Sequence, residues 1–272
     1  ACTGAAVSAY SGHLAFRRRP VMLVVGQTTN NKINAMNNSS IKDIYTKYIS
    51  GLNKLHLNLI NKGDYDGPFI MAEPSDEFKR SKHRILVIGQ ETNGWIGDKR
   101  ITDESGITDN MSVYSIFNFG KTYNSLFFRY ARKASRAIRD SDCYMWTNIF
   151  KFGKSSGRGT PHTLVNDSEI ANFNVLTEEL YYIKPTCVVF MTGPDYDQYA
   201  IQRIPDIKFI EIHGFSTREF AHVISQHLPI HSYRIYHPGY GNRKKIMYDN
   251  CFAHIAKNAQ QGIAPEPPSA AR

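Results

Sequence analysis

Arg84-Ile-Leu-Val-Ile-Gly-Gln-Glu-Thr-Asn-Gly-Trp95 is the segment from which the architecture of this chain can be read. Residues 84–89 predict a short buried strand, because they are apolar and mostly β-branched. The strand ends in a polar loop that carries Gln90, Glu91, Thr92 and Asn93. In open α/β sheets, ligands bind outside the carboxyl ends of the strands. The segment therefore predicts a carboxylate at a functional edge, although an ordinary strand-to-helix loop would have the same pattern.

Strand and helix patterns alternate along the rest of the chain. Further strands are expected at residues 144–150, 186–191, 207–212 and 231–236, and helices at about 41–55, 124–138, 168–183, 194–204 and from Asn242. Ser216-Thr-Arg-Glu219 has a capping-box pattern, typical of a helix start. Residues 96–120 show no periodicity and are expected to form a long loop. This alternation predicts a three-layer α/β/α sandwich with a mostly parallel central sheet.

Composition shifts near both ends suggest where the folded domain lies. Residues 1–35 are Ala/Gly/Ser-rich, then Arg-rich, then Asn-rich, and we expect a disordered or non-native leader there. Residues 259–272 are rich in Pro and Ala and predict a disordered tail. A single domain is expected over residues 36–258.

Charge and cysteine usage narrow the class of protein. The net charge of +9 favours a polyanionic partner such as DNA. No apolar run approaches the roughly 18 residues of a membrane span, so we expect a cytoplasmic protein without membrane contact, and a monomer. The cysteines are scattered, and no metal, cofactor or disulfide is expected; they are Cys2, Cys143, Cys187 and Cys251.

Three strand ends carry unusual polar groups. They are Gln90 and Glu91 after the first strand, Asn148 within Thr147-Asn-Ile-Phe-Lys-Phe152, and His237 within His237-Pro-Gly-Tyr-Gly-Asn-Arg243. Their order and spacing resemble the uracil-DNA glycosylase superfamily over about residues 84–256. Members of that superfamily have a Gly-Gln-Asp-Pro-Tyr or Gly-x-Asn-Pro-Gly loop, an Asn on the second strand and a His-Pro-Ser loop before the last helix. Each motif is short, but the three together are more specific.

The resemblance implies a monofunctional DNA glycosylase that flips a base out of the duplex and hydrolyses its N-glycosidic bond. Glu91 matches the residue that positions water, and His237 matches the residue that stabilises the departing base. Asn148 and Gln90 match groups that bind the base. An aromatic floor for that base is expected from Phe119 first, then Phe117 or Trp95. The expected DNA contacts are Thr92, Asn93, Lys151, Lys154, Pro238, Gly239, Tyr240, Asn242, Arg243, Lys244 and Lys245, with Tyr240 or Arg243 as the side chain that fills the gap.

The first loop departs from the family pattern, and this widens the range of substrates. Asn93 or Gly94 stands where the family has the Tyr that excludes the thymine methyl group. Uracil and bulkier 5-modified pyrimidines, such as hydroxymethylated or glucosylated cytosine of phage DNA, are therefore both candidates. Repair and antiviral defence both remain open as biological roles.

Two other interpretations stay open at this point. A protein of the same fold could hold DNA or another protein without cutting it. A different α/β enzyme would need an acidic metal cluster or a phosphate-binding loop, and neither is visible in the sequence.

Overall fold

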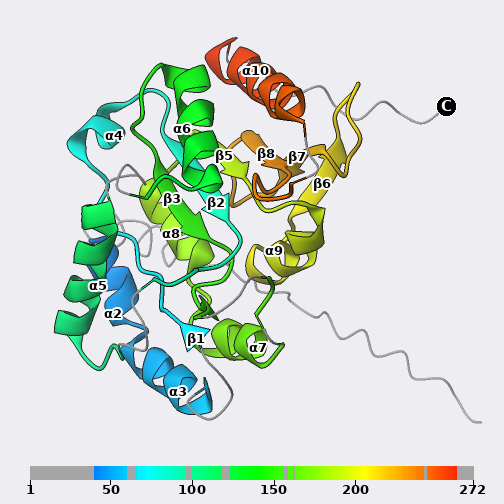
Figure 1. Cartoon of the computed structure of the whole chain (residues 1–272). Coiled ribbons are helices and arrows are strands. Elements are labelled where there is room, and N and C mark those ends of the chain that lie inside the picture. The colour runs from blue at the N-terminus through cyan, green and yellow to red at the C-terminus, as the bar shows by residue number, and fades with distance from the viewer. Residues whose placement is uncertain are drawn as a thin grey trace, which may run out of the picture. The chain divides into compact units, whose positions relative to one another are not determined.

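A six-stranded sheet with the order β3-β2-β5-β8-β7-β6 lies at the centre of the protein (Figure 1). The computed structural model describes residues 40–59, 65–95, 100–117, 123–155, 159–161, 163–241 and 244–261. Four strands run parallel: β2 (Ile85–Gly89), β3 (Met145–Asn148), β5 (Cys187–Phe190) and β8 (His231–Ile235). The strand β7 (Phe220–Ile224) is antiparallel to β8 and to β6 (Lys208–Glu211). The expected mixed α/β fold with a mostly parallel sheet is confirmed.

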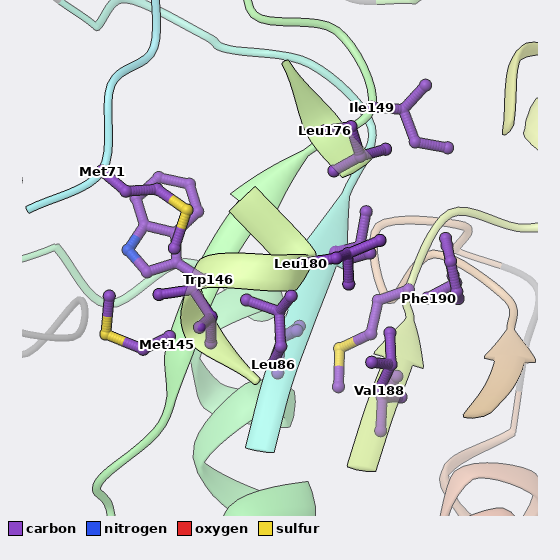
Figure 2. Close-up of a cluster of buried hydrophobic side chains, with 14 of the residues drawn as sticks. Met71, Leu86, Met145, Trp146, Ile149, Leu176, Leu180, Val188 and Phe190 are labelled. Carbon is purple, nitrogen blue, oxygen red and sulfur yellow. The ribbon is translucent and has the colours of Figure 1, made fainter. Parts of the chain in front are cut away.

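Helices flank the sheet on both sides. Successive side chains of a strand point to opposite faces, and the buried strands β2 and β5 therefore present apolar side chains on both faces. From β3, Trp146 packs on Phe128 of α6 (Leu126–Arg139), with ring centroids 5.0 Å apart. The neighbouring Thr147 points the other way and donates a hydrogen bond to Glu179 of α8 (Leu176–Ile183). Figure 2 shows apolar side chains of α8 packed among those of the strands, including Leu86, Val188 and Leu180.

The helix α10 (Lys245–Gln261) lies parallel to α6. Tyr130 packs on Tyr248 near the start of the two helices, and Gln260 donates hydrogen bonds to carbonyls of α6 near the end. Because α10 follows the end of β8, and α6 follows β2 and runs parallel to α10, both helices begin on the side of the sheet where the parallel strands end.

The remaining described elements surround this core. They are α2 (Ile41–Thr46), α3 (Ile49–Leu59), α4 (Asp76–Arg80), α5 (Glu104–Phe117), α7 (Thr163–Asn172), the 3-10 helix η2 (Pro194–Tyr196), α9 (Asp197–Arg203), and a ribbon of β1 (Tyr65–Asp66) with β4 (Gly153–Lys154).

Several expected elements differ from the structure. The loop expected over residues 96–120 contains α5, whose few buried residues include the polar Asn110, and this hides the helical period. The helices expected at 41–55 and 168–183 are each divided in two. The capping-box pattern at residues 216–219 leads into the strand β7, because Arg234 binds the carbonyls of Thr217 and Arg218 and holds them in a turn. The helix α10 reaches Gln261, beyond the expected start of the tail.

The helical spacing predicts an inward face of Leu126, Phe127, Tyr130, Ala134 and Ile138 for α6, and the observed buried face differs from it. Its buried residues are Phe128, Ala131, Ala134, Ser135 and Ile138, whereas Leu126 is exposed and Phe127 is half-buried. Ser135 can be buried because its hydroxyl donates a hydrogen bond to the Ser141 carbonyl at 2.6 Å. This shift brings Phe127 to the edge of the sheet.

Candidate active site at the strand ends

The loops after the parallel strands are joined by backbone hydrogen bonds. Gly89 and Asn148 are partners in the ladder between β2 and β3. Ile149 and Phe150 donate from their N–H groups to the carbonyls of Gly89 and Gln90, at 3.0 and 2.9 Å. The N–H of Gly193, after β5, donates to the carbonyl of Ile235 at the end of β8. Backbone hydrogen bonds therefore hold the segments after β2 and β3 together, and likewise those after β5 and β8.

Asn148 and Phe127 both lie against Gly89. A Cβ atom at Gly89 would lie 2.4 Å from Asn148 Oδ1 and 3.1 Å from the Phe127 ring, so the close approach requires glycine. Asn148 is 3% exposed, and its Oδ1 faces Gly89 at the end of β2. A carboxamide offers both a donor and an acceptor, so Asn148 is a candidate for ligand recognition.

His237 is held in one orientation by its own loop. The N–H of Gly239 donates to His237 Nδ1 at 3.0 Å, so the neutral imidazole carries its proton on Nε2. Its ring stacks with Phe127, with centroids 6.0 Å apart and planes 17° apart. Phe127 therefore stacks on His237 and also lies beside Gly89, where Asn148 is found.

Glu91 lies on the loop after β2 and is half-buried. The Tyr196 hydroxyl donates a hydrogen bond to Glu91 Oε2 at 2.5 Å. Burial raises the pKa of Glu91, while the Tyr196 hydroxyl, the Lys154 ammonium and the Gly159 N–H all oppose this by favouring the ionised form. The site therefore contains a carboxylate that is partly desolvated and held by a specific donor.

Gln90 and Tyr240 brace the loop of Glu91 against the loop of His237. Gln90 Nε2 donates to the Thr192 carbonyl at 2.6 Å and to the Tyr240 hydroxyl at 3.2 Å. Tyr240 packs on Gly193, where a Cβ atom would lie 2.9 Å from its ring. The Tyr240 side chain, expected together with Arg243 as a candidate to fill the gap in DNA, is thus folded back onto the protein in this structure.

Two residues expected to contact DNA are instead part of the interior. Lys151 is 2% exposed, and its ammonium group is bound to Glu179 at 2.6 Å and to Thr147. Burial lowers the pKa of Lys151, and the Glu179 carboxylate opposes that shift. Thr92 is buried, and its hydroxyl donates to the Asp66 carbonyl at 3.0 Å. Both expectations were wrong because the partners of these side chains lie far away in the sequence.

The expected aromatic floor is only partly described. Phe119 lies outside the described residues, as do Asn242 and Arg243. Phe117 and Trp95 pack on each other with centroids 5.6 Å apart, and both also pack on Trp146. Phe127 is the ring that stacks on His237, and the sequence pattern did not predict this. The sequence contained only a weak indication of this role, namely an aromatic residue directly before the buried Phe128 of α6.

The rim around these residues carries positive charge. Lys244 and Lys245 are exposed at the start of α10, and Lys154 is close enough to Glu91 to favour its ionised form. Asn93 and Gly239 are exposed as well, whereas Pro238 is buried. Along α6, most basic side chains are already occupied: Lys133 pairs with Asp249, Arg136 with Asp142 and Arg139 with Glu77.

Other kinds of site find little support in the described residues. No three His, Cys, Asp or Glu side chains among them are grouped to hold a metal ion. None of the helices in this part of the chain has both the length and the apolar composition needed to cross a membrane.

No protein-family model matches this chain, and no curated protein matches it either.

Proposed function

We propose that this protein is a monofunctional DNA glycosylase related to the uracil-DNA glycosylase superfamily. It would flip a base out of DNA and hydrolyse its N-glycosidic bond to leave an abasic site. The observation that carries the proposal is that Glu91, Asn148 and His237 lie at the carboxyl ends of β2, β3 and β8 in one parallel part of the sheet, with Phe127 against Gly89 and stacked on His237.

The base would be bound by three side chains. The Phe127 ring offers an aromatic surface for stacking, and the Asn148 carboxamide offers a donor and an acceptor for the base edge. His237 presents a proton on Nε2, because Nδ1 accepts from Gly239. A neutral imidazole donor can stabilise the negative charge that develops on a base oxygen as the base departs.

Glu91 would act on the sugar. Cleavage of a glycosidic bond passes through an oxocarbenium-like state, which a nearby carboxylate stabilises. The same group can orient the attacking water. An enzyme with water as nucleophile needs no lysine adduct, and Lys151, the lysine nearest in sequence to Asn148, is buried in an ion pair with Glu179.

The loop after Glu91 supports a substrate with a substituent at the pyrimidine 5-position. A Cβ atom at Gly94 would meet nothing within 4 Å, and Asn93 is exposed. We therefore propose 5-modified pyrimidines, including the modified cytosines of phage DNA, as substrates beside uracil.

The test uses end-labelled duplexes and single strands that carry uracil, a thymine mismatch, hydroxymethylcytosine or glucosylated cytosine. Alkali would reveal abasic sites as strand breaks. We expect breaks that require alkali, and a loss of about 10²- to 10⁴-fold in rate for Glu91→Gln and for His237→Asn. The exposed Glu211→Gln and His213→Asn variants are matched controls and should keep the full rate.

Borohydride treatment during turnover distinguishes the mechanism. A covalent protein–DNA adduct would contradict hydrolysis by water and point to a lysine nucleophile. A protein that shifts DNA in a gel but releases no base from any of these substrates would instead be a binding module.

A further inference from the structure

Tyr196 touches the candidate catalytic carboxylate from an element that the sequence motifs did not include. It is the last residue of η2, in the connection that follows β5, and its hydroxyl donates to Glu91 Oε2 at 2.5 Å. Gly193, with a φ of 74°, and Pro194 begin the turn that places it there.

The ring of Tyr196 is fixed by packing. It is 4% exposed and lies edge-on against Phe150 and Tyr199, with centroids 6.1 and 5.6 Å away. Phe150 belongs to the connection after β3, so Tyr196 links three strand-end loops. A side chain held this firmly can restrict the rotamers of the more flexible glutamate.

We propose that Tyr196 is a positioning residue: its hydroxyl holds one carboxylate oxygen of Glu91 in place, so that the ionised carboxylate faces the sugar and the water. This inference rests on the glycosylase function proposed above. A carboxylate has about four acceptor positions, so the bond from Tyr196 leaves room for a water molecule.

The charged and titratable groups around Glu91 set the direction of the effect. They are the Tyr196 hydroxyl, the Lys154 ammonium and the Tyr240 hydroxyl. Burial raises the pKa of Tyr196 further above its ordinary value, so Tyr196 remains a neutral donor. Such a donor favours the ionised carboxylate, and its removal should raise the pKa of Glu91.

The experiment compares Tyr196→Phe with Tyr199→Phe. Both keep the ring, and the Tyr199 hydroxyl forms no hydrogen bond with any residue in the described ranges. For Tyr196→Phe we expect a fall in kcat of about tenfold to a hundredfold with little change in KM, since a bond to a charged group is lost. The acidic limb of the rate profile should move to higher pH by about one unit. Tyr199→Phe should behave like the wild type.

An NMR titration of the Glu91 carboxyl carbon without DNA supplies a readout that does not depend on activity. An unmoved pKa and an unmoved acidic limb in Tyr196→Phe would overturn the positioning role while leaving wild-type glycosylase activity intact. A raised pKa in a protein that releases no base from any substrate would overturn the glycosylase function and, with it, the catalytic role of the pair.

Discussion

At the scale of single residues, Phe127 is the side chain next to both His237 and the end of β2. Its ring stacks with His237 and lies against Gly89, beside the carboxamide of Asn148. The expected aromatic residues did not include it, because the helical pattern assigned Phe127 to the inward-packed face of its helix, whereas the structure buries Phe128 instead. Phe128 is buried against Trp146, with centroids 5.0 Å apart, while Phe127 is half-buried and stacks on His237.

Phe127→Ala should weaken the use of the substrate without abolishing the chemistry. Loss of stacking on one base costs about 1–3 kcal/mol, so kcat/KM should fall roughly 5- to 150-fold. Steady-state rates on the best substrate measure this, with the exposed neighbour Leu126→Ala as the control. An unchanged kcat/KM in a folded Phe127→Ala protein would show that the base is bound elsewhere.

At the scale of elements, a buried ion pair connects the end of β3 with α8. Glu179 is fully buried, and it accepts hydrogen bonds from Lys151, Thr147 and Tyr45, at 2.6, 2.9 and 2.7 Å. Because Thr147 precedes Asn148, this network holds the strand segment that carries the candidate base-binding amide. The network therefore supports the site indirectly, because Glu179 of α8 binds Thr147 and Lys151, on either side of Asn148.

Lys151→Met should destabilise the protein strongly, because Glu179 would remain buried without its counter-charge. Such losses cost about 3–5 kcal/mol. The double variant Lys151→Met/Glu179→Leu removes both charges and should recover much of that stability. Denaturant unfolding measures the effect, and Lys154→Met, on a half-buried lysine of the adjoining β4, should cost much less. Equal losses for both single variants would contradict the role of the pair.

The loops after β2 and β3 also depend on one close backbone contact. A Cβ atom at Gly153 would lie 1.9 Å from the Thr92 carbonyl oxygen, so any side chain there must separate the two loops. We expect Gly153→Ala to cost about 1–3 kcal/mol of stability and to reduce activity at ordinary temperature.

Gly241→Ala is the matched control for Gly153→Ala, since a Cβ atom at Gly241 would meet nothing within 4 Å. Thermal unfolding and base-release rates should separate the two variants. A Gly153→Ala protein with wild-type stability and rate would show that the loops can move apart freely.

At the scale of the whole molecule, the net charge is +9, and some basic side chains are paired with carboxylates while others are exposed. Much of the positive charge of α6 is paired with carboxylates, while Lys244 and Lys245 are exposed where α10 begins. That helix starts on the same side of the sheet as Glu91 and His237. Helix starts favour phosphate groups, so this rim is the expected contact with the DNA backbone.

The Lys244→Ala/Lys245→Ala variant should bind duplex DNA more weakly and with less dependence on salt. Each phosphate contact contributes about 0.9 to the slope of log K against log salt, so the slope should decrease in magnitude by about two. Binding titrations at several salt concentrations measure it. Lys208→Ala/Lys257→Ala removes the same charge from β6 and from late in α10, and should leave the slope nearly unchanged.

The sequence by itself determined the parallel strands and the polar residues at their ends. Short apolar, β-branched runs have few alternatives to a buried strand, and parallel strands end at one edge of a sheet. Glu91, Asn148 and His237 therefore lie at or just after the ends of β2, β3 and β8, with Gly89 and Asn148 paired in register. Whether they act as a glycosylase stays a proposal.

Only the tertiary structure decided which polar side chains are interior and which ring lies beside the site. Lys151 follows β3 in a polar, glycine-rich stretch, yet it is buried because Glu179, 28 residues later, returns on α8 as its partner. Tyr196 reaches Glu91 across 105 residues of sequence, and β7 forms where a helix was indicated. Such contacts depend on how distant segments pack, and a local pattern carries no information about distant partners.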